Sequence, residues 1–205
     1  MAYKKVYLIR HGKTKANEEK RYAGRRTDAV LSEEGIRETE DQRPVINGII
    51  GEALDRICSG YMNRAVQTAE LLFPGYNKLQ ICDLAEIDFG DFEGKNYEEL
   101  NGNEDYQKWI DSKGEMDFPG GEGREAHTDR SFEIFNELLG DRNKDENIAV
   151  VCHGGNIMGI MMRLAGGDYY DYMSKNLGGY CLELETDDEG IHFITYHKLD
   201  TGNNT

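Results

Sequence analysis

The chain has 205 residues, of which 24 are Lys or Arg and 39 are Asp or Glu, so its formal net charge is −15. This length suits one α/β domain with a buried sheet, and the strong negative charge disfavours binding to nucleic acid or to an anionic membrane. An anionic substrate must therefore be bound by a few local cations, which gives weight to every arginine near a predicted site.

The cysteines and the lengths of the apolar runs indicate in which cellular compartment the protein is expected. The four cysteines are widely spaced, contain no C-x-x-C pair and lie mostly in apolar runs, which predicts reduced, buried thiols. No apolar run approaches the roughly 20 residues that a membrane span needs, and the N-terminus leads directly into a predicted strand rather than a signal peptide. These features predict a cytoplasmic protein without a membrane partner.

Strands and helices alternate along the chain. Short apolar or β-branched runs predict strands buried on both faces, at 6–9, 55–58, 79–82 and 148–152. Apolar residues at helical spacing predict helices at 64–73 and 125–139, and this alternation is typical of an α/β sheet. Ser32 predicts a helix that begins at residue 33, and Pro44 is expected to kink or interrupt it, which would allow two helical pieces.

The remaining segments predict a cap, a hairpin and a loose end. Residues 88–130 are rich in Gly, acidic and aromatic residues and are expected to form a cap over one end of the sheet, within a single domain covering 1–205. The pattern at 180–196 predicts an antiparallel hairpin whose exposed edge is a candidate homodimer contact. Residues 201–205 are expected to fray.

Two His-Gly pairs follow predicted strands, at His11 and at His153. One histidine at the end of a strand is usually structural, but two such pairs meet in one cavity if their strands are adjacent. The backbone N–H groups of Gly154 and Gly155 lie at a predicted helix start and would add donors for an anion. The repeated pattern therefore indicates a site.

Two further side chains fit an anion site. Arg64 stands where a helix opens after a strand, and its planar guanidinium suits a phosphate or a carboxylate. Glu86 follows another strand beside apolar residues, a setting that raises the pKa of a carboxyl group toward the range of a general acid. Cap residues Tyr97, Tyr106 and Trp109 are expected, together with Phe118, to shape the pocket.

Six short motifs in this order resemble those of the histidine phosphatase superfamily, also called the phosphoglycerate mutase-like family. They are R-H-G-K-T-K-A-N at 10–17, the glycine-bounded segment 24–35, S-G-Y-M-N-R-A-V-Q-T at 59–68, the segment 84–94, P-G-G-E at 119–122 and V-C-H-G-G at 151–155. The sequence departs from the family pattern in the spacing from Gly24 to Asp28, at Ala29-Val30, at Phe92 and at Gly123. These departures concern the loop at the entrance rather than the central residues.

The resemblance implies a three-layer α/β/α sandwich with a mostly parallel sheet, and a phosphatase of small phosphorylated metabolites that needs no metal or cofactor. The residues it implies for the site are His11 as the nucleophile that becomes phosphohistidine, Arg10, Arg64 and His153 on the phosphoryl oxygens, Asn17 as a further hydrogen-bond donor, and Glu86 as the proton donor. If His11 is neutral while Glu86 and His153 keep their protons, activity should have a bell-shaped, mildly acidic optimum.

Other mechanisms compete with this interpretation. Cys58 and Arg64 have the C-x5-R spacing of cysteine-dependent phosphatases, but the loop between them has one glycine, which favours the histidine scheme. A nucleotide-binding loop would need glycine where Tyr7 stands. A mutase-type phosphoryl transferase and a catalytically silent phospholigand-binding protein remain open, although the chain length resembles the short phosphatase members, including the α-ribazole phosphatase-like branch.

Overall fold

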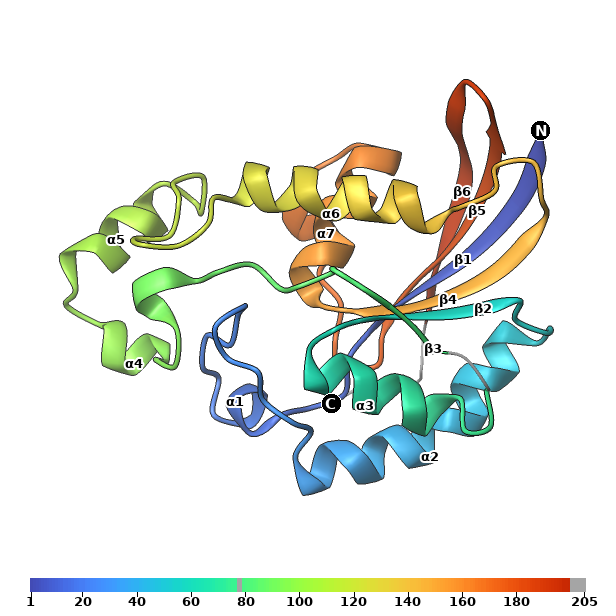
Figure 1. The fold of residues 1–205 in the computed structure, drawn as a ribbon. Coiled ribbons are helices and arrows are strands. Elements are labelled where there is room, and N and C mark those ends of the chain that lie inside the picture. The colour runs from blue at the N-terminus through green and yellow to red at the C-terminus, as the bar shows by residue number, and fades with distance from the viewer. Residues whose placement is uncertain (77–78, 200–205) are drawn as a thin grey trace.

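A six-stranded sheet forms the centre of the computed structural model, which describes residues 1–76 and 79–199 (Figure 1). The strand order is β3-β2-β4-β1-β5-β6. The strands are β1 (Ala2–Arg10), β2 (Arg56–Gly60), β3 (Leu79–Cys82), β4 (Glu146–Cys152), β5 (Gly179–Asp187) and β6 (Gly190–Leu199). The predicted frayed end, 201–205, lies outside the described residues.

The sheet is mostly parallel, as predicted. Strands β1 to β4 pair in parallel, and β5 and β6 form the predicted antiparallel hairpin on the other side of β1. Because β1 and β4 are neighbours with Arg10 opposite Cys152, both His-Gly pairs leave the sheet at the same edge. That edge, at the carboxyl ends of the parallel strands, is where ligand sites of α/β sheets form.

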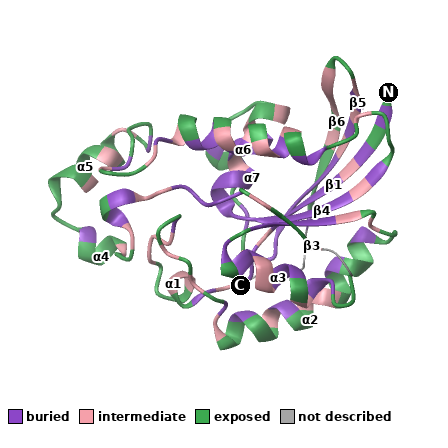
Figure 2. Ribbon diagram, in the orientation of Figure 1, coloured by how far each residue is buried: buried purple, intermediate pink, exposed green. Residues whose placement is uncertain are grey.

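Two helical layers enclose the sheet because successive strand residues point to opposite faces. Val6 and Leu8 belong to the apolar cluster on one face, and Tyr7 and Ile9 belong to the cluster on the other. Figure 1 shows α6 (Arg124–Leu138) and α7 (Gly154–Ala165) on one side of the sheet, and α2 (Glu33–Ile50) and α3 (Asn63–Leu72) on the other. Buried residues concentrate on the strands between them (Figure 2), so the three-layer α/β/α prediction is confirmed.

Two local predictions are wrong. Helix α2 is continuous through Pro44, and Ser32 caps it by accepting a hydrogen bond from the Gly35 N–H at 3.0 Å. Pro44 cannot donate to the carbonyl of Glu40, but both residues are exposed, so water can satisfy that carbonyl. Strand β3 lies at the edge of the sheet, because among the described strands it pairs only with β2. Its Ile81 is exposed, so β3 is not buried on both faces as predicted.

The cap projects from the carboxyl edge of the sheet and carries its own apolar cluster, in which Phe92, Leu100 and Phe118 are buried. Its helical elements are η1 (Gly90–Phe92), α4 (Tyr97–Leu100) and α5 (Glu104–Asp111); α1 (Lys15–Glu18) and η2 (Tyr169–Tyr172) lie outside it in the sequence. Residues 124–130 of the expected insertion belong to α6, which packs against α7. The organisation of residues 1–205 as a single domain stays a prediction.

No helix in the described ranges is long and apolar enough to cross a membrane.

A buried ion pair ties β1 to β4. Lys4 Nζ lies 2.8 Å from Glu146 Oε2, and both side chains are almost completely buried. Arg56 Nη2 donates to the same oxygen at 2.8 Å. Burial opposes ionisation of this carboxyl group, but the hydrogen bonds from Lys4, Arg56 and Lys144 outweigh it and lower the pKa of Glu146 to about 2. The carboxylate is therefore ionised wherever the sheet is folded at neutral pH.

We expect Glu146→Gln to lower the free energy of unfolding at pH 7 by about 3 kcal/mol, because it leaves a buried ammonium without its counter-charge. In the folded protein the pKa of Glu146 lies below its ordinary value of about 4.3. The stability that the ionised Glu146 contributes is therefore fully present above pH 4.3 and is lost as the pH falls toward 2. Urea titrations of both proteins at several pH values should therefore show their difference shrinking on acidification. Glu52→Gln, which breaks the partly exposed pair with Lys5, should cost about 1 kcal/mol or less. A difference at Glu146 that kept its full size near pH 2 would contradict this account.

Candidate active site

The two histidines predicted from the sequence meet at the carboxyl edge of β1 and β4. Their ring centroids are 5.1 Å apart, and both side chains are buried. His11 Nδ1–H donates to the Gly12 carbonyl at 2.7 Å, and Asn176 Nδ2 donates to the His11 carbonyl at 2.8 Å. The first bond fixes the tautomer, since Nδ1 carries the proton and the lone pair stays on Nε2. His11 can therefore present a neutral nitrogen nucleophile.

The surroundings of His153 favour its neutral form, and the expected protonation of His153 against a bound phosphoryl group stays a prediction. Its Nδ1 accepts a hydrogen bond from Arg64 Nε at 3.2 Å and therefore carries no proton. Burial, and then the positive charge of Arg64, lower the pKa of His153 well below its ordinary value. The remaining Nε2–H is buried and has no hydrogen-bond partner among the described residues, which leaves one donor free for a ligand.

The buried Arg64 and the partly buried Arg10 supply positive charge beside these rings. Arg64 Nη1 donates to the Thr27 carbonyl at 2.7 Å, and Arg10 Nη1 donates to the Ser174 carbonyl at 2.6 Å. Neither guanidinium forms an ion pair with a carboxylate within residues 1–76 and 79–199. Burial lowers the pKa of both groups, but a guanidinium stays charged in proteins. The site therefore holds two positive charges, one buried and one partly buried, whose hydrogen-bond partners are neutral carbonyls and an imidazole, an arrangement that suits a dianion.

Glu86 lies beside the start of α7 and is nearly buried. Its Oε1 accepts the N–H groups of Ile87 at 3.0 Å and of Gly155 at 3.1 Å. A Cβ atom at residue 155 would lie 2.3 Å from Glu86 Oε1, so only glycine leaves room for the carboxylate. The Gly155 N–H is therefore engaged by Glu86, contrary to the prediction that it faces an anion, while Gly154 borders the cavity together with Arg10.

Asn17 and the loop at 23–27 complete the surroundings of the two histidines and two arginines. Asn17 Oδ1 accepts the Thr14 N–H at 3.0 Å and closes a capping box on α1, and the residue borders the same cavity as His11. Arg64 Nη2 donates to the carbonyls of Ala23 and Gly24 at 3.2 and 3.3 Å. The unusual loop after Gly24 thus holds the guanidinium directly.

His127 was not found by sequence reasoning. This fully buried side chain on α6 places Nε2 3.9 Å from Glu86 Oε1 and 3.3 Å from Asn156 Nδ2. Asn156 Nδ2 in turn donates to the Ala85 carbonyl at 2.9 Å. The spacing could have indicated that His127 is buried, because it precedes Ser131 and Phe135 by four and eight residues and lies on the same buried face of the helix.

Two adjoining cavities meet at the proposed reaction centre. One, of about 180 Å³, is bordered by His11 and Asn17, and the other, of about 340 Å³, is bordered by Trp109 and Phe118 of the cap. The residues bordering both are Arg10, Tyr22, Glu86 and Phe89. Tyr97 is more than half exposed and borders neither cavity, so its predicted place in the pocket is wrong.

The cysteine alternative fails on position and ionisation. Cys58 is fully buried in the apolar cluster beneath α6 and α7, and its Sγ donates to Gln80 Oε1 at 3.5 Å. Burial raises the pKa of this thiol to about 12. The reactive thiolate is therefore unfavourable at neutral pH. Within the described ranges, no group of three His, Cys, Asp or Glu side chains is arranged to hold a metal ion.

Comparison with known proteins identifies the family of the chain. Residues 6–196 match the model of the histidine phosphatase superfamily, branch 1. The chain belongs to this superfamily. This histidine phosphatase is 30% identical over 166 residues to the adenosylcobalamin/alpha-ribazole phosphatase of Escherichia coli (strain K12), covering 79% of each chain. It is 29% identical over 167 residues to phosphoglycerate mutase-like protein 4 of Arabidopsis thaliana, covering 78% of this chain and 71% of the relative.

A solved structure shows the same fold. A histidine-to-alanine variant of phosphoserine phosphatase from Entamoeba histolytica, in complex with phosphoserine, superposes with a TM-score of 0.75 at 23% identity, covering 97% of this chain and 99% of that chain. This agreement confirms that the histidine phosphatase has the phosphoglycerate mutase-like α/β fold.

The pKa values of the histidine phosphatase's paired histidines predict how the site responds to acid. Burial, followed by the charges of Arg64 and Arg10, lowers the pKa of His11 well below its ordinary value. His11 should therefore stay neutral and keep its Nε2 lone pair as the pH falls through 6.5. In an NMR titration, the Cε1–H signals of His11 and His153 should hold their neutral shifts past the midpoint of a reference histidine peptide. A midpoint for either ring at or above 6.5 would contradict this prediction.

Proposed function

We propose that His11 takes a phosphoryl group from a small phosphomonoester and that water then removes it. The observation that carries this proposal is the pair of guanidinium groups of the buried Arg64 and the partly buried Arg10, which have no carboxylate partners in the described ranges and lie beside the free Nε2 lone pair of His11. A phosphate dianion compensates both charges and places phosphorus within reach of that nitrogen. Phosphatases among the superfamily relatives support the same chemistry.

The first half-reaction forms a bond between His11 Nε2 and phosphorus while the bond from phosphorus to the ester oxygen breaks in line. Arg10, Arg64 and the free Nε2–H of His153 hold the phosphoryl oxygens, with Asn17 at the edge of the same cavity. Glu86 gives its proton to the departing alkoxide oxygen. The products are an alcohol, phosphohistidine and a Glu86 carboxylate.

The second half-reaction reverses the protonation of Glu86. Its carboxylate takes a proton from water, the water oxygen attacks phosphorus, and the bond to His11 Nε2 breaks. Glu86 is protonated again, and inorganic phosphate leaves the two arginines. The Gly155 N–H bond orients the carboxylate for both steps.

We also propose the cytoplasm as its location and a small phosphorylated metabolite as its ligand. The four cysteines are free thiols, which supports a reducing compartment. The net charge of −15 argues against nucleic acid as a partner. Strand β6 is an open sheet edge that carries the exposed Ile194 and Tyr196, and a homodimer would use this edge.

The experiment that tests the function is release of inorganic phosphate from a metabolite panel in EDTA, with acid and alkaline stability of the trapped phosphoenzyme measured in parallel. Hydrolysis with an acid-labile, alkali-stable phosphoenzyme is expected. Efficient isomerisation of 3-phosphoglycerate with a trace of 2,3-bisphosphoglycerate and without hydrolysis would identify a mutase instead. Binding of phosphate esters without turnover of any of them would identify a silent phospholigand-binding protein.

A further inference from the structure

The larger cavity beside Glu86 is walled by rings. The aromatic residues that border it are Tyr22, Phe89, Trp109, Phe118, Tyr169 and Tyr170. The thioethers of Met158 and Met173 add polarizable apolar surface. Because Arg10 and Glu86 also border this cavity, the alcohol part of a phosphoester bound at His11 would extend into it.

The rings come from two separate parts of the chain. On the cap side, Trp109 stacks on Phe118 with centroids 4.8 Å apart, and Phe89 meets the edge of Phe118 at 5.0 Å. On the side of η2, Tyr169 and Tyr170 form an edge-to-face pair at 5.2 Å. Two aromatic walls of this kind offer faces and edges to a flat ring that enters between them.

Charge and polarity in the cavity fit the same kind of ligand. Arg124, the first residue of α6, holds its guanidinium 5.6 Å from the centre of the Tyr169 ring and forms no hydrogen bond or ion pair among the described residues. A cation here opposes the helix dipole, so its position is not explained by helix stability. Guanidinium planes bind aromatic faces, and Arg124 extends the aromatic wall.

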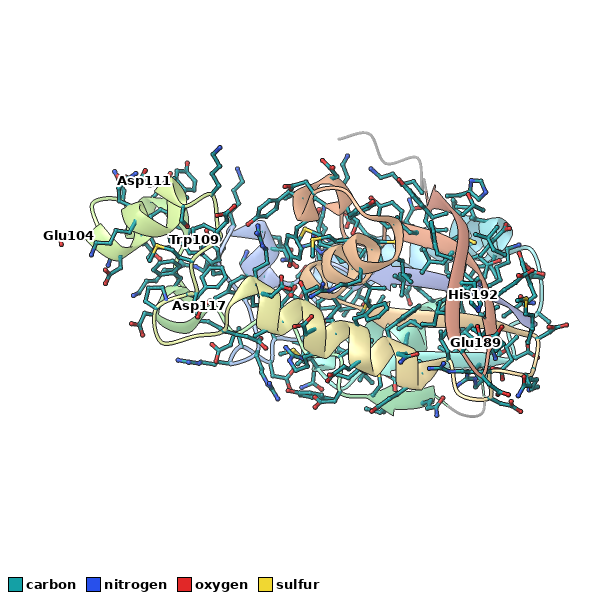
Figure 3. The ribbon with its side chains drawn as sticks, turned by 90° about the horizontal axis from the view of Figure 1, so that it is seen from above. Glu104, Trp109, Asp111, Asp117, Glu189 and His192 are labelled. Carbon is teal, nitrogen blue, oxygen red and sulfur yellow. The ribbon has the colours of Figure 1, made fainter. Side chains whose placement is uncertain are left out.

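Few polar side chains are left for a sugar-like alcohol. Ser174 is 3% exposed, and its Oγ has no hydrogen-bond partner in the described part of the chain. Trp109 Nε1 is also buried and unpaired. The acidic side chains of α5 lie elsewhere, since Figure 3 shows Glu104 and Asp111 on the outside of the cap and Trp109 nearer the body of the molecule. Two isolated neutral donors, beside the guanidinium of Arg124, suit a ring with one or two acceptor atoms better than a polyol.

We propose that the substrate's alcohol part carries a planar aromatic ring, held in this cavity between the cap and η2. The inference rests on the proposed function, because the ring is placed by the ester bond to the phosphoryl group at His11. Trp109 and Tyr170 provide the two walls, and Arg124 lies over the Tyr169 face.

Benzyl phosphate and cyclohexylmethyl phosphate provide a matched test. Both are esters of a primary alcohol with the same carbon skeleton, and they differ in whether the ring is flat and aromatic. We expect kcat/KM for benzyl phosphate to be about tenfold higher or more. Equal values for the two esters would overturn the inference. Phosphohistidine trapped from both esters in that case would show that the proposed function still stands, whereas failure to trap it from any ester would refute the function itself.

Variants locate the effect in the cavity. Trp109→Leu and Tyr170→Leu should each lower kcat/KM for benzyl phosphate about fivefold while changing that for cyclohexylmethyl phosphate by less than about twofold. Tyr97→Leu, which removes an exposed cap tyrosine outside the cavity, should change neither value. Trp109 packs in the cap cluster and its loss can disturb the cap, so the partly exposed Tyr170 is the decisive variant. Equal losses with both esters at Tyr170 would contradict aromatic selection.

Discussion

His11→Ala should abolish the acid-labile, alkali-stable phosphoenzyme and lower kcat by about 10⁴-fold or more, because no other side chain among residues 1–76 and 79–199 offers a free nitrogen lone pair beside Arg10 and Arg64. His153 is oriented differently, since its Nδ1 accepts from Arg64 and its Nε2 carries the proton. The measurement is quench-flow with a labelled ester, followed by acid and alkaline treatment of the denatured protein.

Cys58→Ser is the matched control for His11→Ala. Its thiol lies in the apolar cluster under α6 and α7, so the variant should retain both the phosphoenzyme and turnover. A phosphoenzyme that persisted in His11→Ala and disappeared in Cys58→Ser would refute the histidine mechanism. Circular dichroism of both variants checks that the sheet is intact.

Glu86→Gln should separate the two half-reactions. For an alkyl ester, kcat should fall about 10²- to 10³-fold, because the departing alkoxide no longer receives a proton. p-Nitrophenyl phosphate has a leaving group that needs no proton, so the variant should still give a rapid burst of p-nitrophenol and then stall. The amide oxygen can still accept the Gly155 N–H, which preserves the packing of α7.

A block in hydrolysis of the phosphohistidine would show that Glu86 acts in the second half-reaction. Without a base to activate water, phosphohistidine should accumulate to nearly one equivalent in Glu86→Gln and remain transient in the unaltered enzyme. Glu125→Gln, at an exposed carboxylate on α6 that pairs with Arg163, should behave like the unaltered enzyme. Equal percentage losses with the alkyl ester and p-nitrophenyl phosphate, without phosphoenzyme accumulation, would argue that Glu86 is structural.

Much of the sheet and the centre of the site could be predicted because both depend on local pattern. Apolar runs located the strands, and the two His-Gly pairs at strand ends met as expected because β1 and β4 are neighbours. The course of α2 could not be predicted in the same way, since Pro44 is tolerated only because the carbonyl it leaves unpaired is exposed.

Properties that depend on contacts between distant residues escaped the sequence. The preference of His153 for its neutral form follows from its burial and from the charge and hydrogen bond of Arg64, 89 positions earlier in the chain. His127 had no motif around it, and its relation to Glu86 exists only because α6 packs beside α7. The hydrogen bond from the Gly155 N–H to Glu86 also could not be predicted from the helix-start motif at residues 153–155.

The placement of the cap has a consequence for how such an enzyme can diversify. Most of the cap, residues 88–123, is one uninterrupted stretch between β3 and α6, whereas the groups proposed to bind phosphate come from the ends of β1 and β4 and from α3. Glu86 precedes that stretch, and η2 supplies the opposite wall of the larger cavity. On the proposed function, replacement of residues 88–123 would alter the alcohol that the enzyme accepts and leave the phosphoryl chemistry in place. A designer could therefore graft a new cap wall without rebuilding the reactive groups.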